Sequence, residues 1–253
     1  MNFTKSRAYS VLYMFALSAL FAGLLSLVKV VTAEQVADNE RTAASKNLVR
    51  VFELMEITPQ TTGAQLADAL TKSVRPLWIV DNGGPKLVDV EPDKTATVLY
   101  RLWLALDNTG KPSAFAFPIG GKGFWGPIFG LLAVQPDGLT IRNIVWTRHG
   151  ETPGLGARIE EDQYRAKFKG KQTADPAVAR FRVVPEGTMG DDPHAVDQIT
   201  GATQTTVVGM GKFLNDNFAQ WHKYLPLLLD YLRQQGLTAP EPSTVEASSD
   251  GQE

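Results

Sequence analysis

Cysteine is absent from this chain of 253 residues, which excludes disulfides, a thiolate nucleophile, a CxxC redox pair and any zinc or iron–sulfur centre held by cysteine. Any redox chemistry must therefore come from a group that is bound or attached to the chain. Histidine is scarce as well, with three copies and no HExxH or other metal-ligand spacing. We interpret all three as ordinary surface or core residues: His149, His194 and His222.

An excess of charge of one sign is also missing. The chain has 25 Lys and Arg against 27 Asp and Glu, a net charge of -2, which gives no electrostatic reason to expect a nucleic-acid partner. No GxGxxG lies between a predicted strand and a predicted helix, and no GxxxxGK[ST] is present, so neither a dinucleotide fingerprint nor a P-loop is indicated. The length suits one large domain or two small ones.

A long apolar run is present near the N-terminus: residues 8–28 carry no charge. As a helix at about 1.5 Å per residue, this run reaches about 30 Å, the thickness of a bilayer's hydrocarbon core. A cleaved signal peptide is the alternative, because residues 31–33 (VTA) resemble a cleavage site. Apolar regions of signal peptides span roughly 7–15 residues, and this longer run is closed by Lys29, so we favour an uncleaved anchor. Lys5 and Arg7 predict a cytoplasmic N-terminus, with the chain from residue 33 onward outside the cytoplasm.

The rest of the chain predicts an α+β domain with a mostly antiparallel sheet and flanking helices. Helical spacing predicts a stalk helix over residues 35–55, and the Pro-, Ser- and acid-rich end is typical of a disordered tail. The predicted strands cover residues 95–106, 114–118, 128–134, 139–147 and 181–184. A helix over 207–221 and a second apolar helix over 225–232 follow. The expected boundaries are 1–32 for tail and anchor, 33–58 for the stalk, 59–236 for the domain and 237–253 for the acidic tail.

The first of three glycine-rich stretches, residues 120–126 (GGKGFWG), lies between two predicted strands. Its flexible backbone, one cation and two aromatic rings suit an anionic group with a flat ring. Lys122 and backbone amides would bind phosphate, and Trp125 would stack. The alternative is a wide hairpin whose aromatic side chains cover the core.

The second stretch, residues 148–156 (RHGETPGLG), follows the predicted 139–147 strand. Pro153 and Gly154 fit a type II turn. From this loop Glu151 and Thr152 would present a carboxylate and a hydroxyl to a ligand. His149 beside Glu151 would suit acid–base chemistry, but we favour its interpretation as an ordinary residue.

The third stretch, residues 197–206 (DQITGATQTT), opens the predicted 207–221 helix. Its threonines are typical N-cap residues, and Gly201 with Ala202 allows another backbone to approach. A helix N-terminus also favours a bound phosphate, because free amides and the helix dipole point at it. Both interpretations of this stretch stay open on composition alone.

Taken together, the three stretches resemble the covalent-FMN family that includes the NqrC subunit of sodium-translocating NADH:quinone reductases and the RnfG subunit of Rnf complexes. DQITGATQT resembles the family's flavinylation motif Asp-x-x-(Ser/Thr)-Gly-Ala-(Thr/Ser), and GETPGLG resembles its companion loop. GKGFW, a strand, an Asp-Gly turn, a second strand and GETPGLG follow in the order found in the reductase subunit. The resemblance covers most of residues 8–235.

The resemblance implies that FMN is joined through its phosphate to the last threonine of the motif, Thr203. A separate FMN transferase would recognise Asp197, Thr200, Gly201 and Ala202. For the remaining pocket we expect Trp125 and Leu155 to contact the isoalloxazine edge. Lys122, Glu151 and Thr152 would supply polar contacts to the flavin or its ribityl chain.

The function implied is that of an electron-carrying flavoprotein subunit of a Na+-translocating NADH:ubiquinone oxidoreductase, catalytically incomplete alone and docked among the other subunits. It would sit in the bacterial inner membrane as a single-pass protein, with its FMN domain in the periplasm. The alternatives are an RnfG-type subunit or another covalent-FMN carrier, and, in a different class, an anchored extracytoplasmic binding module without a cofactor.

Overall fold

The computed structural model describes residues 7–173 and 179–237, so residues 238–253 of the predicted tail lie outside the described residues. The chain divides into two compact units, residues 1–44 and 45–253. Helix α1 runs from Arg7 to Phe52. Among the described residues it is the one helix long and apolar enough to cross a membrane, by length and composition. Its apolar run is not covered by the described chain, and Phe15 and Val30 are 72% and 74% exposed.

The stalk helix ends earlier than the sequence predicts. It stops at Phe52 rather than Met55, because Glu53 adopts a φ of 53°, in the left-handed region that ends an α-helix. The anchor and the predicted stalk therefore belong to one continuous helix. The predicted domain boundaries at residues 32, 58 and 236 stay predictions.

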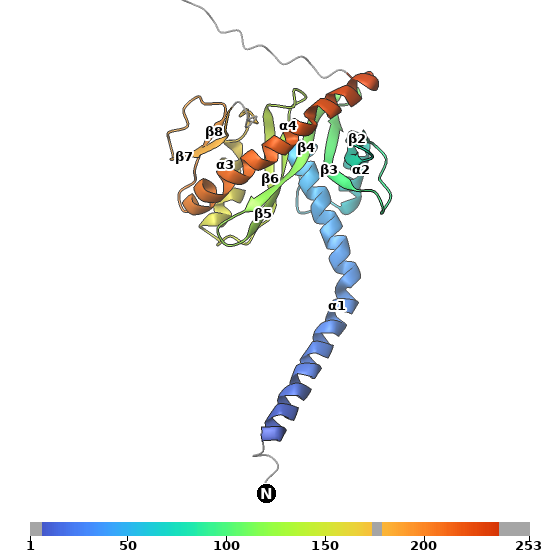
Figure 1. Cartoon of the computed structure of the whole chain (residues 1–253), viewed down its shortest axis with the longest axis vertical. Coiled ribbons are helices and arrows are strands. Elements are labelled where there is room, and N and C mark those ends of the chain that lie inside the picture. The colour runs from blue at the N-terminus through green and yellow to red at the C-terminus, as the bar shows by residue number, and fades with distance from the viewer. Residues whose placement is uncertain (1–6, 174–178, 238–253) are drawn as a thin grey trace, which may run out of the picture. The chain divides into compact units, whose positions relative to one another are not determined.

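Six antiparallel strands form the main sheet of the second unit, in the order β2-β1-β3-β4-β5-β6 (Figure 1). The strands are β1 (Val74–Asp81), β2 (Pro85–Val88), β3 (Val98–Leu106), β4 (Pro112–Lys122), β5 (Pro127–Val134) and β6 (Ile141–Arg148). Every neighbouring pair is antiparallel, which confirms the predicted α+β class. The predicted hairpin over 128–147 corresponds to β5 and β6.

Helix α4 (Gly211–Gln234) lies across one face of this sheet (Figure 1). Trp221 stacks on Phe117 of β4, with ring centroids 4.4 Å apart, and its indole N–H donates to the Gly138 carbonyl at 2.7 Å. The predicted pair of helices over 207–221 and 225–232 is wrong, because α4 continues through Pro226. Proline removes one backbone donor, but the buried stripe continues past it in the same helix, and its burial offsets that loss. That stripe consists of Trp221, Leu225, Leu228 and Leu232.

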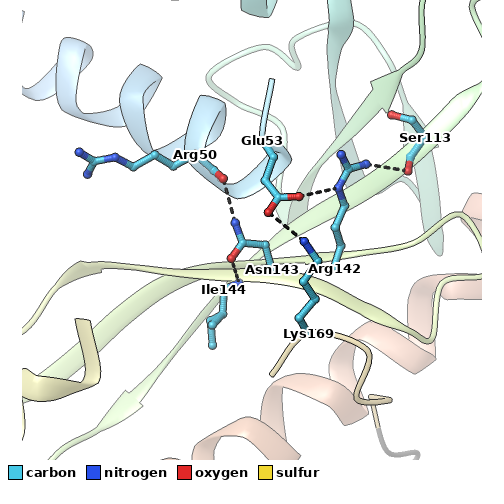
Figure 2. Close-up of polar contacts among 7 residues, drawn as sticks. All are labelled: Arg50, Glu53, Ser113, Arg142, Asn143, Ile144 and Lys169. Carbon is cyan, nitrogen blue, oxygen red and sulfur yellow. Dashed lines mark hydrogen bonds and ion pairs between the residues drawn. The ribbon is translucent and has the colours of Figure 1, made fainter. Parts of the chain in front are cut away.

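The last turn of α1, which belongs to the second unit, packs on the opposite face of the sheet. Val51 and Phe52 lie in a cluster with small side chains that let a helix approach closely. Those side chains include Ala105, Ala114, Ala116 and Ala133. Figure 2 shows the polar contacts beside this cluster. The Asn143 amide donates to the Arg50 carbonyl at 2.9 Å, and Glu53 forms ion pairs with Arg142 and Lys169 at 3.6 and 3.3 Å. The Arg50 carbonyl, at the end of α1, thereby gains a second donor besides the Glu53 N–H at 3.2 Å.

Shorter elements complete the described chain. Helix α2 (Gly63–Ser73) begins with a capping box between Thr62 and Gln65, and strands β7 (Arg182–Val184) and β8 (Ala195–Asp197) pair in parallel. The 3-10 helix η2 (Gly156–Glu160) and helix α3 (Asp162–Ala166) follow β6. A π-helix, η3 (Gln204–Met210), leads directly into α4.

Candidate functional site

The first glycine-rich stretch forms the end of β4 and the turn into β5. Lys122 pairs with Pro127, and the Gly123 N–H donates to the Gly126 carbonyl at 2.7 Å, which closes a tight turn. Phe124 and Trp125 at its tip are 52% and 68% exposed and pack edge to face at 5.2 Å. The alternative in which these aromatic rings cover the core is therefore wrong. Lys122 is exposed beside them.

The second stretch forms a turn between β6 and η2. Gly154 has a φ of 73°, as the type II turn requires, and the Leu155 N–H donates to the Thr152 carbonyl at 3.1 Å. Thr152 and Leu155 are exposed, whereas Glu151 is buried. This loop thus presents one hydroxyl and one apolar side chain to solvent.

His149 has a structural role in that loop. Its Nδ1 accepts the Glu151 backbone N–H at 3.2 Å, and its Nε2 lies 3.0 Å from a carboxylate oxygen of Glu160. These two contacts hold the His149 ring within the loop. The geometry agrees with the interpretation of His149 as an ordinary residue.

Asp197, at the end of β8, turns its carboxylate toward the 187–189 loop. It is 8% exposed and accepts the backbone N–H groups of Thr188 and Met189 at 3.1 and 2.9 Å. Burial works to raise the pKa of Asp197, but the backbone hydrogen bonds outweigh it and hold the pKa below its ordinary value. Asp197 thus fixes the chain just before the motif's Thr200 and Gly201.

The motif turns sharply at Gly201, which has a φ of 87°. A Cβ at this position would lie 3.4 Å from the Gly154 carbonyl oxygen, so the second and third stretches meet here. The Thr200 hydroxyl donates to Glu186, and the Arg158 guanidinium donates to the Thr200 carbonyl. Sequence reasoning missed Arg158, since it stands outside the three stretches.

Thr203 immediately precedes η3. Its side chain is exposed and makes no capping hydrogen bond, so the expectation of threonine N-caps is wrong at this helix start. The buried hydroxyl of Thr206 instead donates to the Ala202 carbonyl at 3.1 Å. The Gly211 N–H donates to the Thr206 carbonyl, five residues back, as in a π-helix. Such helices are rare and frequently mark functional sites.

The first stretch packs against η3. A Cβ on Gly209 would lie 2.7 Å from the Lys122 carbonyl oxygen, so only glycine permits this approach. Glu151 connects the same elements: its carboxylate accepts hydrogen bonds from the Phe124 and Trp125 amides and from the Thr205 hydroxyl. The structure therefore brings all three stretches together around the start of η3. Thr205, two residues after Thr203, is a contact that sequence reasoning missed.

A separate surface cavity of about 790 Å³ lies beside the end of α1 and is lined by residues such as Arg50, Glu53 and Arg165. None of the residues predicted to bind a cofactor lines it. The candidate site is the open surface around Thr203, with the exposed Trp125 and Leu155 on the loops that meet η3.

The sequence around this surface is similar to known proteins. The FMN-binding domain family matches residues 123–212, which contain the second and third stretches and most of the first. The NqrC subunit of the Na(+)-translocating NADH-quinone reductase from Pasteurella multocida is 33% identical over 135 residues, 53% of this chain and 49% of that protein. The same subunit from Chlamydia trachomatis is 28% identical and covers 78% of this chain and 85% of its own. The matches span about half the length of the first relatives compared.

Solved structures agree. Shewanella oneidensis NqrC superposes with a TM-score of 0.61 at 26% identity, covering 78% of this chain and 99% of that one. The corresponding reductase subunit from Parabacteroides distasonis, at 24% identity and a TM-score of 0.59, shares the fold over 74% of this chain and 93% of its own. The glycine-rich loops around η3 and these matches lead to one conclusion: residues 123–212 match the FMN-binding domain family, and the chain is similar to NqrC subunits over most of its length.

Proposed function

We propose that the protein is the membrane-anchored electron-carrier subunit of a Na+-translocating NADH:ubiquinone oxidoreductase, with FMN attached to Thr203 through a phosphoester bond. One observation carries this proposal: Thr203 is exposed and its side chain makes no capping hydrogen bond. It lies inside the segment that matches FMN-binding domains. The relatives named as the NqrC subunit of that reductase support the choice of complex.

The residues around Thr203 fit a flavin phosphate. Backbone N–H groups at the start of a helix have no partner within the helix, and the helix dipole there favours an anion. Helices η3 and α4 together run without a break to Gln234, so the dipole of a long helix ends beside Thr203. The bound flavin would supply the redox group that accepts and releases electrons. The chain has no cysteine that could supply one.

The remaining site residues divide by exposure. Trp125 and Leu155 are exposed apolar side chains on neighbouring loops, suited to the isoalloxazine edge. Lys122 and Thr152 are exposed polar side chains suited to the flavin or its ribityl chain. The buried Glu151 already accepts hydrogen bonds from protein donors, so its role in the pocket would be to hold the loops. The recognition sequence of an FMN transferase would consist of Asp197, Thr200, Gly201 and Ala202.

The long apolar helix supports a single-pass anchor in the bacterial inner membrane. The positive charges of Lys5 and Arg7 before it would keep the N-terminus cytoplasmic, with the FMN domain in the periplasm. A covalent bond suits an electron carrier there, since lost FMN would not be readily replaced outside the cytoplasm. The partners would be the other subunits of the reductase and, during maturation, the FMN transferase.

The test is expression of the full chain together with an FMN transferase, followed by a denaturing gel viewed under ultraviolet light. We expect a fluorescent band whose intact mass exceeds that of the chain by FMN less one water. Thr203→Ala should abolish it, whereas Thr203→Ser, which keeps a hydroxyl, should retain it. Expression without the transferase is the control. A colourless wild-type band from cells with active transferase would overturn the proposal.

An RnfG-type subunit is the alternative within the class, and a binding module without cofactor is the alternative outside it. Genes for the multi-span membrane subunits and the NADH-oxidising subunit next to this one would favour the reductase. The match to FMN-binding domains weighs against a module without cofactor.

A further inference from the structure

Glu151 is a buried carboxylate whose three hydrogen-bond donors come from distant parts of the chain. It is 5% exposed. Its Oε1 accepts the backbone N–H groups of Phe124 and Trp125 at 2.9 and 3.1 Å, and its Oε2 accepts the Thr205 hydroxyl at 2.7 Å. All three groups donate, so the Glu151 carboxylate acts here only as an acceptor.

Two glycines leave the space that this carboxylate occupies. A Cβ on Gly123 would lie 2.4 Å from Oε1 of Glu151, and a Cβ on Gly156 would lie 2.5 Å from its Oε2 and 2.7 Å from the Thr205 hydroxyl. These distances are far shorter than a van der Waals contact. Glycine at 123 and 156 is therefore a condition for the contact between Glu151 and its donors.

We infer that Glu151 is a positioning residue that ties the aromatic turn at Phe124 and Trp125 to the helix segment just after Thr203. We call this arrangement of Glu151, Phe124, Trp125 and Thr205 the Glu151 bridge. It rests on the proposed function in one respect: the flavin on Thr203 is the group against which the bridge orients Trp125. Glu151 itself contacts protein donors rather than the flavin.

The turn closes with its own hydrogen bond, from the Gly123 N–H to the Gly126 carbonyl, but the Phe124 and Trp125 amides are held by Glu151. Phe124 and Trp125 lie mostly in solvent, so burial contributes little to holding them in place. Hydrogen bonds from two successive amides to one carboxylate oxygen are directional, and they fix the backbone from which both rings project. Because the same carboxylate accepts the Thr205 hydroxyl, the position of the turn follows that of η3.

The first arm of the test uses flavin-free full chain in detergent, in a Thr203→Ala background, and measures hydrogen exchange at the Phe124 and Trp125 amides. Glu151→Ala should speed exchange there by about tenfold or more, because both amides lose their acceptor. The Leu139 amide in the turn between β5 and β6 is the internal reference and should not change. Equal exchange in the two proteins would overturn the inference.

The second arm uses the flavinylated chain and measures flavin fluorescence per bound flavin. Thr205→Val keeps the shape of the side chain but removes its hydroxyl, and we expect about a twofold or greater rise, because Trp125 no longer stacks on and quenches the flavin. Thr205→Ser restores the hydroxyl and should restore the wild-type fluorescence. Fluorescence that is identical in the Val and Ser variants would contradict the bridge. Thr205→Val also serves if Glu151→Ala does not fold.

The two arms separate the bridge from the proposed function. A wild-type chain that never receives covalent FMN would overturn the proposed function, while amide exchange in the first arm still tests the bridge. A wild-type chain that carries FMN, combined with unchanged exchange and fluorescence in the variants, would overturn the bridge alone.

Discussion

Strand β5 has a turn at each end, and the two turns are built differently. At the β5–β6 turn, Asp137 accepts the amides of Leu139 and Thr140 at 2.8 and 2.9 Å, both within three residues of it. At the β4–β5 turn, the acceptor for Phe124 and Trp125 is Glu151, 27 and 26 residues away. The first turn is stabilised by its own sequence and by the core, and the second by a residue of another loop. The β5–β6 turn thus serves the fold, whereas the β4–β5 turn serves the candidate site.

The largest expected effect on the free energy of unfolding is at Trp221, which supports the β5–β6 turn. Trp221→Ala should lower the free energy of unfolding by about 3–5 kcal/mol, because it removes a buried ring stacked on Phe117 and leaves the Gly138 carbonyl without its donor. Trp221→Phe keeps a ring and should cost about 1–2 kcal/mol. Urea unfolding of the full chain in detergent measures both. Equal loss in the two variants would show that the hydrogen bond, rather than packing, dominates.

A smaller effect is expected at the turn itself. Asp137→Ala should destabilise the protein by about 1–2 kcal/mol, since two buried or half-buried amides lose their acceptor, and should leave covalent flavin unchanged. The unfolding midpoint and the ultraviolet-lit gel are the two measurements. A loss of flavin in this variant would mean that the β5–β6 turn and the β4–β5 turn are coupled.

The smallest effect on stability is expected at Trp125, at the tip of the β4–β5 turn. Trp125→Ala should change the free energy of unfolding by less than about 0.5 kcal/mol, because the side chain is 68% exposed. Flavin fluorescence should rise all the same, since the proposed stacking partner is gone. Thermal unfolding and fluorescence of the same sample measure the two effects. A Trp125→Ala protein that is strongly destabilised would place this ring among the core residues.

The β5–β6 turn could be predicted from the sequence because its hydrogen bonds are local: Asp137-Gly138 between two apolar runs is a sufficient signal. On the other side of the sheet, β1, which lies between β2 and β3, had no such signal. Strand β1 is apolar over four successive buried residues and contains Pro76, so it shows neither alternation nor the composition of a central strand. Strand β8 has only three residues, too few for a pattern.

The candidate site, too, could be predicted from the sequence only in part. The glycines marked the three stretches, since close approach leaves few other residue types possible. The contacts among the stretches had no local signal, because the donors of Glu151 lie 26 to 54 residues away. Proline likewise misled the prediction at α4: Pro226 breaks the local propensity, and only the buried leucines on the sheet explain why the helix continues.

The π-helix η3 sets the direction in which Thr203 points relative to the buried stripe of α4. Each residue of an α-helix turns the side-chain direction by about 100°, so the wider turn of η3 changes the angle between Thr203 and the buried stripe of α4. The stripe fixes how α4 lies on the sheet, while η3 decides toward which side Thr203, the proposed attachment residue, faces. Gain or loss of one residue in η3 would swing that hydroxyl around the helix axis and leave the packing of α4 as it is. A change in a single turn of helix would thus re-aim the Thr203 side chain, and with it the proposed flavin, without rebuilding the packing of α4.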